Sequence, residues 1–219
     1  MKTISISLRR ISLCCLFLSI ISVGLLAQNY TVNSIPYNPT SFTSGTSILL
    51  NDDQFSPVIP LGFGFCFYGT YYPAVVIGAN GVISFNVSDA NGYCQWPIGT
   101  LIPSSSLPMN CIMVPMQDMY IPAGGVIRYE TLGMAPNRVF TVSYDSVDMF
   151  SCTSLTLSSQ VKLYEGLNII EIFIREKNIC AGWNGGAAIE GIQNASGTSA
   201  NCVPGRNYPT QWSATNDGK

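Results

Sequence analysis

The sequence contains no histidine, and only 10% of its 219 residues are charged. The absence of histidine removes the commonest general base, the commonest zinc ligand and every Ser-His or Cys-His nucleophile pair. No two cysteines have the Cys-x-x-Cys spacing of a zinc or redox site. Basic residues form no cluster in the body of the chain, which excludes a nucleic-acid partner. We therefore expect a protein that is not an enzyme and needs no cofactor.

The first 27 residues have the pattern of a secretory signal peptide. Lys2, Arg9 and Arg10 precede a continuous apolar run from 11 to 26, and Ala27 offers a small residue for cleavage. Loss of three of the ten basic residues leaves seven against twelve acidic ones, a net charge of −5. No later apolar stretch is long enough to span a bilayer. We expect residues 28–219 to be secreted or held at the cell surface, without a membrane span.

Residues 61–69 read Leu-Gly-Phe-Gly-Phe-Cys-Phe-Tyr-Gly, in which large apolar residues alternate with smaller ones. A period of two places one apolar face on a β-strand. Asn80-Gly81 tolerates positive φ at both central turn positions, which predicts a tight hairpin. Further short strands follow with regular turn signals, and no segment has a helical apolar period. The sequence predicts an all-β, disulfide-stabilised antiparallel sandwich in one domain, residues 28–219. The expected core residues are Leu61, Phe63, Phe65, Phe67, Ile83, Phe85, Val139, Val161, Leu163, Ile170 and Ile172.

Six cysteines remain after residue 27, an even number that favours disulfides in an exported chain. A hairpin centred near Gly166 would place Cys152 opposite Cys180, so this bridge is predicted from register. Cys94 and Cys111 bracket one loop and are a possible second pair. Cys66 with Cys202 then follows by elimination alone, and the full connectivity stays open.

Aromatic residues in loops rich in Gly, Pro or Asn are the candidate ligand contacts. Such side chains on a rigid sandwich stack on sugar rings or grip protein partners. A loop tryptophan that folds back over the end of the core is the competing interpretation. The candidates are Trp96, Trp183, Trp212, Tyr93 and Tyr208.

Acidic residues offer one weak metal pattern. Asp52 and Asp53, with Asp118, could supply oxygen ligands for Ca²⁺, but their spacing matches no EF-hand loop. Asx side chains that bond their own turn account for such a cluster without a metal. We therefore expect no metal, and keep these aspartates as the candidate calcium ligands.

Two stretches lack a strand pattern. Residues 88–109 are the longest, and a loop of this length is usually functional or covalently pinned. Residues 212–219 end in turn formers, without a predicted closing strand. This ending favours the hypothesis that the chain is the N-terminal part of a longer surface protein.

Nine segments follow one another along the chain in a recognisable order: 52–53, 61–69, 80–85, 114–118, 125–130, 138–147, 160–165, 168–172 and 188–192. Together they resemble the nidogen-like extracellular domain found in large modular bacterial surface proteins. The resemblance implies an extracellular β-rich module for adhesion or matrix contact, without catalysis. Met116 and Gln117 stand where the family usually has an aromatic residue and a Trp, and Tyr144 stands where it has a Trp.

The expected function is a non-catalytic binding or adhesion module that contacts extracellular protein or matrix. The alternative is a carbohydrate-binding module that uses the loop tryptophans. A glycan hydrolase would need two facing carboxylates, such as Asp118 and Glu130. A structural spacer in a longer surface protein is the fourth interpretation. The residues leave open the choice between protein and glycan, the calcium dependence and the oligomeric state.

Overall fold

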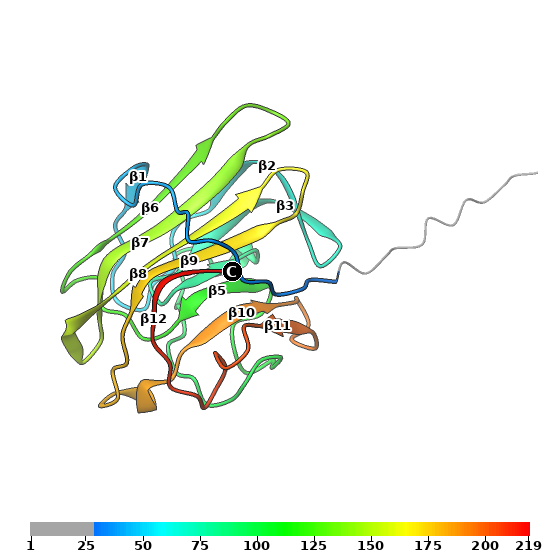
Figure 1. Cartoon of the computed structure of the whole chain (residues 1–219). Helices are drawn as coiled ribbons and strands as arrows, with labels where there is room; N and C mark the ends of the chain where they lie inside the picture. The colour runs from blue at the N-terminus through cyan, green and yellow to red at the C-terminus, as the bar shows by residue number, and fades with distance from the viewer. Residues whose placement is uncertain (1–28) are drawn as a thin grey trace, which may run out of the picture.

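The computed structural model describes residues 29–219, so the predicted signal peptide lies outside the described residues (Figure 1). Two six-stranded sheets pack face to face, and all strand pairs are antiparallel. This confirms the predicted antiparallel β-sandwich. Among the described residues, no helix is long and apolar enough to cross a membrane.

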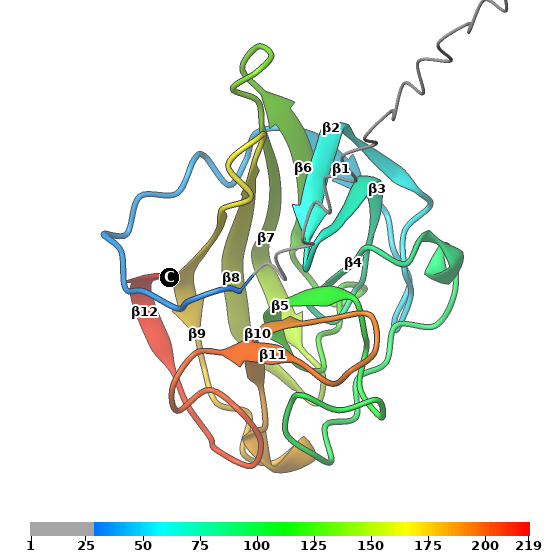
Figure 2. The same cartoon turned by 90° about the vertical axis from the view of Figure 1, so that its right-hand side faces the viewer.

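The first sheet contains the longest strands. Figure 2 shows β6 to β9 running side by side on one side of the molecule, with β5, β10 and β11 in front of them. In spatial order the first sheet consists of β1 (Thr46–Ile48), β6 (Val126–Leu132), β7 (Val139–Met149), β8 (Cys152–Tyr164), β9 (Ile170–Lys177) and β12 (Ala214–Gly218).

The second sheet carries the hairpin predicted from Asn80-Gly81. Val76 pairs with Ser84, and Gly81 has φ +73°. A Cβ at Gly81 would lie 2.0 Å from the carbonyl oxygen of Pro115, so only glycine fits this turn. In spatial order the second sheet consists of β11 (Ala200–Cys202), β10 (Ile189–Gln193), β5 (Cys111–Met116), β4 (Val82–Ser84), β3 (Thr70–Ile77) and β2 (Ile59–Phe67).

The main core lies between the sheets and contains the predicted face of β2. Leu61 and Phe65 are 0% exposed, and Phe65 and Phe67 stack on Phe85. Of the predicted core residues, Ile170 is half-buried and packs against the core at the end of β9. The prediction for Val139 was wrong, because Phe140 and Val142 are the residues of β7 that face the core and Val139 lies on its outer face. The alternating pattern therefore identified the buried face of β2, β8 and β9 but not that of β7.

A second apolar cluster lies on the other face of the second sheet. Residues of the long loop, including Ile98, Ile102 and Leu107, pack on Val76 and Met113. The loop is therefore fixed by apolar burial, and its only regular element near residues 88–109 is the short 3₁₀ turn η1 (Val87–Asp89). It forms a third layer over the sandwich.

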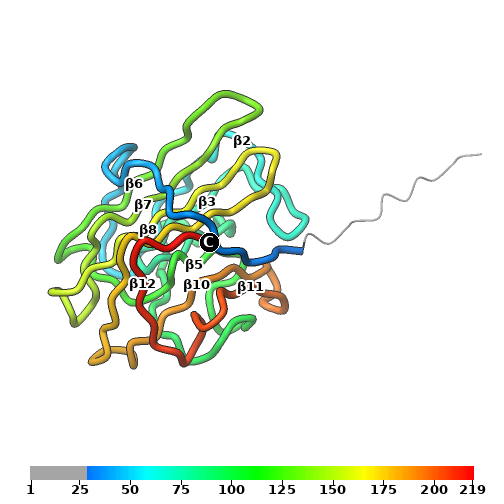
Figure 3. The backbone as a smooth tube through the Cα atoms, viewed as in Figure 1, coloured from blue at the N-terminus to red at the C-terminus, as the bar shows by residue number. Residues whose placement is uncertain are grey.

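The two ends of the described chain differ from expectation. Residues 30–37 have the alternating pattern of a strand, but only Ile35 forms an isolated bridge, to Gly218. The C-terminal stretch was predicted to lack a closing strand, yet β12 pairs with β9 from Ala214 to Gly218. The tube in Figure 3 shows the first described residues meeting the end of the chain there. Turn-forming residues such as Asn and Asp are tolerated because β12 is an edge strand.

The disulfide between Cys152 and Cys180 is confirmed, with 5.9 Å between the two Cα atoms. The pairs Cys94–Cys111 and Cys66–Cys202 are wrong, because all four are free thiols. Cys94 and Cys111 are instead packed as apolar side chains in the outer cluster. Cys66 lies on β2 and Cys202 on β11, at opposite edges of the six-stranded second sheet.

Candidate functional site

Three aspartates that are distant in sequence meet at one end of the sandwich. Carboxylate oxygens of Asp52, Asp53 and Asp118 lie within 4.8 Å of one another. Asp52 and Asp53 occupy the turn after β1, where Asp53 has φ +53°, and Asp118 follows β5. The predicted calcium ligands are therefore neighbours in space.

Asn80, in the turn between β3 and β4, holds these segments together. Its side-chain amide donates to Asp53 Oδ1 at 2.8 Å and to the carbonyl oxygen of Cys94 at 2.9 Å. Its Oδ1 accepts from the backbone N–H of Met119 at 3.0 Å. Asn80 is 0% exposed, so this buried amide is fully used in joining the loops that carry the carboxylates.

The electrostatics of the cluster are unbalanced. The pKa of Asp118 is raised to about 6, mainly by burial; the hydrogen bond from Trp183 lowers it, and the nearby charges of Asp53 and Asp52 raise it. Burial and the charge of Asp53 also raise the pKa of Asp52. Asp52 Oδ1 is buried and has no hydrogen-bond partner among the described residues. The cluster therefore has an excess of acceptors and of negative charge.

Aromatic rings adjoin the carboxylates. The indole Nε1 of Trp183 donates to Asp118 Oδ2 at 2.6 Å. The ring of Trp183 lies 5.6 Å from that of Trp96 and 4.9 Å from that of Phe150. Trp96 and Trp183 are both half-buried. Tyr93 is 62% exposed and forms a bridge with Gln54, next to Asp53. We call this group of Asp52, Asp53, Asp118, Tyr93, Trp96, Phe150 and Trp183 the acidic–aromatic end.

A small cavity of about 20 Å³ opens beside Asp118 and Trp183. Gln117, Phe150, Cys180 and Asn184 also line it. This volume is enough for about one water molecule. The disulfide and the 3₁₀ turn η2 (Asn184–Gly186), the short coil at the lower left in Figure 1, thus border the site directly.

Trp212 and Tyr208 do not belong to this end. Trp212 is 8% exposed, and its Nε1 donates to the carbonyl oxygen of Ala188 at 2.8 Å. The charged groups of Lys177 and Arg206 lie 4.5 and 4.7 Å from its ring. Tyr208 packs, half-buried, against the outer apolar cluster. Trp212 thus folds back onto the core, as the competing interpretation of a loop tryptophan predicts.

The donor set of the acidic–aromatic end would suit a hard cation. Calcium binds carboxylate and carbonyl oxygens and tolerates irregular geometry. Asp52 Oδ1, which lacks a donor, and the carboxylates of Asp53 and Asp118 are the oxygens that could hold it.

The sequence did not predict Phe150 as a member of this end, nor Asn80 as the residue that joins its segments. Phe150 follows β7 and adjoins the disulfide hairpin, but nothing in its local pattern links it to Trp183. Asn80 was identified only as a turn residue, whereas its side chain is the main connector. The signal for Asn80 was present in part, because a turn needs only its backbone and leaves the amide free to bond elsewhere.

Comparisons with known proteins bear on the family of the chain. No curated protein and no solved structure matches the chain. A family model described as NIDO related matches residues 29–218, which include both sheets and the acidic–aromatic end. This match confirms the nidogen-like resemblance of the sequence segments, and a family of extracellular modules is consistent with the disulfide. The chain belongs to the NIDO-related family.

Proposed function

We propose that this protein is a secreted or cell-surface binding module, without catalysis, that contacts an extracellular protein through its acidic–aromatic end. The observation that supports this most directly is the Trp183–Asp118 hydrogen bond of 2.6 Å, with Trp96 alongside. It holds the half-exposed pair Trp96 and Trp183 beside the buried carboxylate of Asp118, and Asp52 and Asp53 are half-exposed next to them.

The chemistry of this surface favours a cationic partner group. Carboxylates attract lysine and arginine side chains, and indole faces bind the same cations through their π systems. Electron-rich rings and acceptors without donors are therefore complementary to a basic segment of a partner protein. The net charge of −5 in residues 28–219 adds a long-range attraction for a positively charged partner.

Glycan binding is the second candidate function. Trp96 and Trp183, tilted by 35° to each other, offer ring faces beside carboxylate acceptors, and Tyr93 is exposed nearby. Sugar rings stack on such faces while their hydroxyls donate to carboxylates.

A binding screen separates the two candidates. Oxidised protein, residues 28–219, is tested against immobilised extracellular matrix proteins and a glycan array. We expect saturable binding to a protein, which Trp183→Ala weakens by about tenfold or more. Tyr71→Ala is the matched control, since Tyr71 is an aromatic residue 71% exposed on β3, outside the acidic–aromatic end. Binding to one glycan class alone would favour the second candidate. Binding that Trp183→Ala leaves unchanged would disprove the proposed surface.

Calcium binding at Asp52, Asp53 and Asp118 is a separate part of the proposal. It is supported by the buried, partnerless Asp52 Oδ1 and by the mutual proximity of the carboxylates. Extracellular modules bind Ca²⁺ with dissociation constants of about 10⁻⁴ to 10⁻³ M. Isothermal titration with Ca²⁺, against Mg²⁺ and against Asp118→Asn, tests this part independently of any partner.

A further inference from the structure

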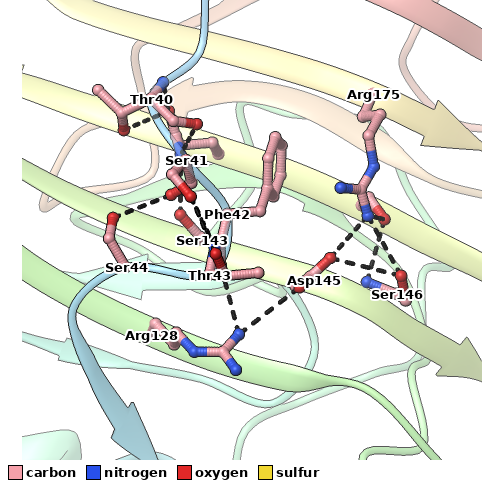
Figure 4. A network of polar contacts seen from close by, with 12 residues as sticks. Thr40, Ser41, Phe42, Thr43, Ser44, Arg128, Ser143, Asp145, Ser146 and Arg175 are labelled. Carbon is pink, nitrogen blue, oxygen red and sulfur yellow. Dashed lines mark hydrogen bonds and ion pairs between the residues drawn. The ribbon is translucent and has the colours of Figure 1, made fainter.

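The outer face of the first sheet is polar and covered by residues 37–44, which we call the strap. Arg128, Ser143, Gln160 and Phe173 form one row across β6 to β9, facing away from the core. Gln160 is 0% exposed and Ser143 only 3% exposed. These side chains are buried because the strap crosses over them. Figure 4 shows the strap above the strands, with Asp145 between Arg128 and Arg175.

The sheet side chains bond to the backbone of the strap at every second residue. Lys162 Nζ donates to the carbonyl oxygen of Asn38 at 2.9 Å. Gln160 accepts from the Thr40 N–H at 2.8 Å and donates to the Thr40 carbonyl at 3.3 Å. Arg128 donates to the Phe42 carbonyl at 3.3 Å. This spacing is the repeat of an extended segment, and contacts to its backbone do not depend on its side chains.

Phe42 is the buried side chain of the strap. Phe42 is 7% exposed, and the guanidinium of Arg175 lies 4.5 Å from the centre of its ring. Asp145 accepts from Arg175 at 2.6 Å and lies 3.6 Å from Arg128. The ion pair with Asp145 therefore holds the Arg175 guanidinium over the pocket that contains the Phe42 ring. The surface thus combines backbone recognition with a pocket for one aromatic residue.

The strap has no covalent or ladder connection to the strands that it crosses. Residues 37–44 belong to no strand. They are followed by Gly45, which has φ +91° and leads into β1. A Cβ at Gly45 would lie 2.6 Å from the carbonyl oxygen of Tyr129, so the turn is built for glycine. All contacts of residues 37–44 with the sheet are non-covalent, and the residues on either side are also held by it, Ile35 by Gly218 and Thr46 by Tyr129.

We infer that this face is a peptide-binding groove which is filled by the protein's own strap and which also accepts the strap of a second copy. Exchange of an identical segment loses no contact, and it is a low-cost route to association. The tethered strap has the advantage of a high effective concentration. Exchange is therefore favoured where copies are crowded or where the tethered strap is weakened.

A complementation experiment tests the exchange with full-length mature protein. Phe42→Ala weakens binding by the strap and keeps the groove intact. Gln160→Ala with Arg175→Ala weakens the groove and keeps the strap intact. We expect each variant alone to sediment as a monomer and their mixture to contain a one-to-one complex. Arg175→Ala alone replaces the double variant if that one does not fold, as judged by circular dichroism. Mixing Phe42→Ala with Tyr71→Ala, whose own groove and strap are both intact, is the matched control and should give less complex.

A peptide experiment measures the groove itself. A labelled peptide of residues 36–45 is titrated into wild-type protein and into Phe42→Ala, with fluorescence polarisation as the readout. We expect about tenfold or greater tightening for Phe42→Ala, because its groove is less occupied by its own strap. The peptide with Ala in place of Phe42 should bind weakly to both. Folded Phe42→Ala that neither binds the peptide nor forms the complex overturns the inference. Peptide binding without the mixed complex retains the groove and overturns the second copy as its occupant.

Discussion

The acidic–aromatic end and the Trp212 cluster contain the same kinds of residue and use them differently. Each has a tryptophan beside carboxylates. At Trp212, the carboxylates of Glu190 and Asp217 are 2.5 and 2.6 Å from Arg206, which lies over the indole. At Trp183, no ion pair to the three aspartates is found in the described part of the chain. Charge compensation, rather than residue type, therefore distinguishes a structural cluster from a surface that needs a partner.

The largest contrast is expected from removal of the two indoles. Trp212→Ala should lower the free energy of unfolding by about 3–5 kcal/mol, because it empties a buried site. Trp183→Ala, at a half-exposed position, should lower it by only about 1 kcal/mol. Urea denaturation of both variants checks this. Equal losses would show that Trp183 is also a core residue and would weaken its assignment as a ligand contact.

Removal of Arg206 should be nearly as damaging. Arg206→Leu leaves Glu190, which is 0% exposed, without its partner and should cost about 3–5 kcal/mol. The double variant Glu190→Gln with Arg206→Leu removes both charges and should recover part of that loss. Recovery measured by thermal unfolding would confirm that the pair is compensated. No recovery would mean that Arg206 acts through packing on Trp212.

Asp118→Asn, unlike the substitutions above, should raise the free energy of unfolding at neutral pH. The pKa of Asp118 is raised to about 6 from 3.8, so the folded state holds the proton more tightly than the unfolded state. The stabilisation of the folded state by protonated Asp118 is therefore fully present below about pH 4 and is lost as pH rises through about 6. We expect Asp118→Asn to gain about 1 kcal/mol at pH 7.5, since solvent screening reduces the effect. The substitution should also make the free energy of unfolding less dependent on pH between pH 4 and 6. A profile unchanged by the substitution would argue against repulsion in the cluster.

The smallest effect is expected from calcium. At three times the dissociation constant, Ca²⁺ should stabilise the wild type by about 0.8 kcal/mol and leave Asp118→Asn unaffected. Asp145→Asn is the control, because Asp145 pairs with arginines on the outer sheet face and should not alter the response. A thermal shift of equal size in Asp118→Asn would place the ion elsewhere.

Local pattern was sufficient for much of the fold. Alternation from 61 to 67 identified the buried face of β2, and register placed Cys152 opposite Cys180. Both depend on neighbours along one strand or hairpin. The pairing of Cys94 with Cys111 failed because an apolar cluster from distant loops buries both thiols separately. Edge strand β12 was missed because its residues have little strand preference, and pairing with β9 determines its structure.

The candidate site was predictable only as separate parts. The three aspartates, Trp96 and Trp183 were each identified, but their meeting depends on Asn80, which bonds to three segments through one side chain. Such a connection has no sequence period. Trp212 was misassigned as a ligand contact for a related reason, because the cations that cover it come from β9 and from the loop after β11.

The disulfide has a consequence for the order in which the protein matures. It joins the β7–β8 turn to the segment after β9, and the N–H of Trp183 donates to the carbonyl oxygen of Cys180. Both sheets have their hydrophobic contacts without this bond, whereas Phe150 and Trp183 lie on the two segments that it ties together. Formation of this bond would thus complete the acidic–aromatic end after the sheets have formed. Under the proposed function, a chain folded without the bond would lack a fixed binding surface, so its binding would report the redox state of its surroundings.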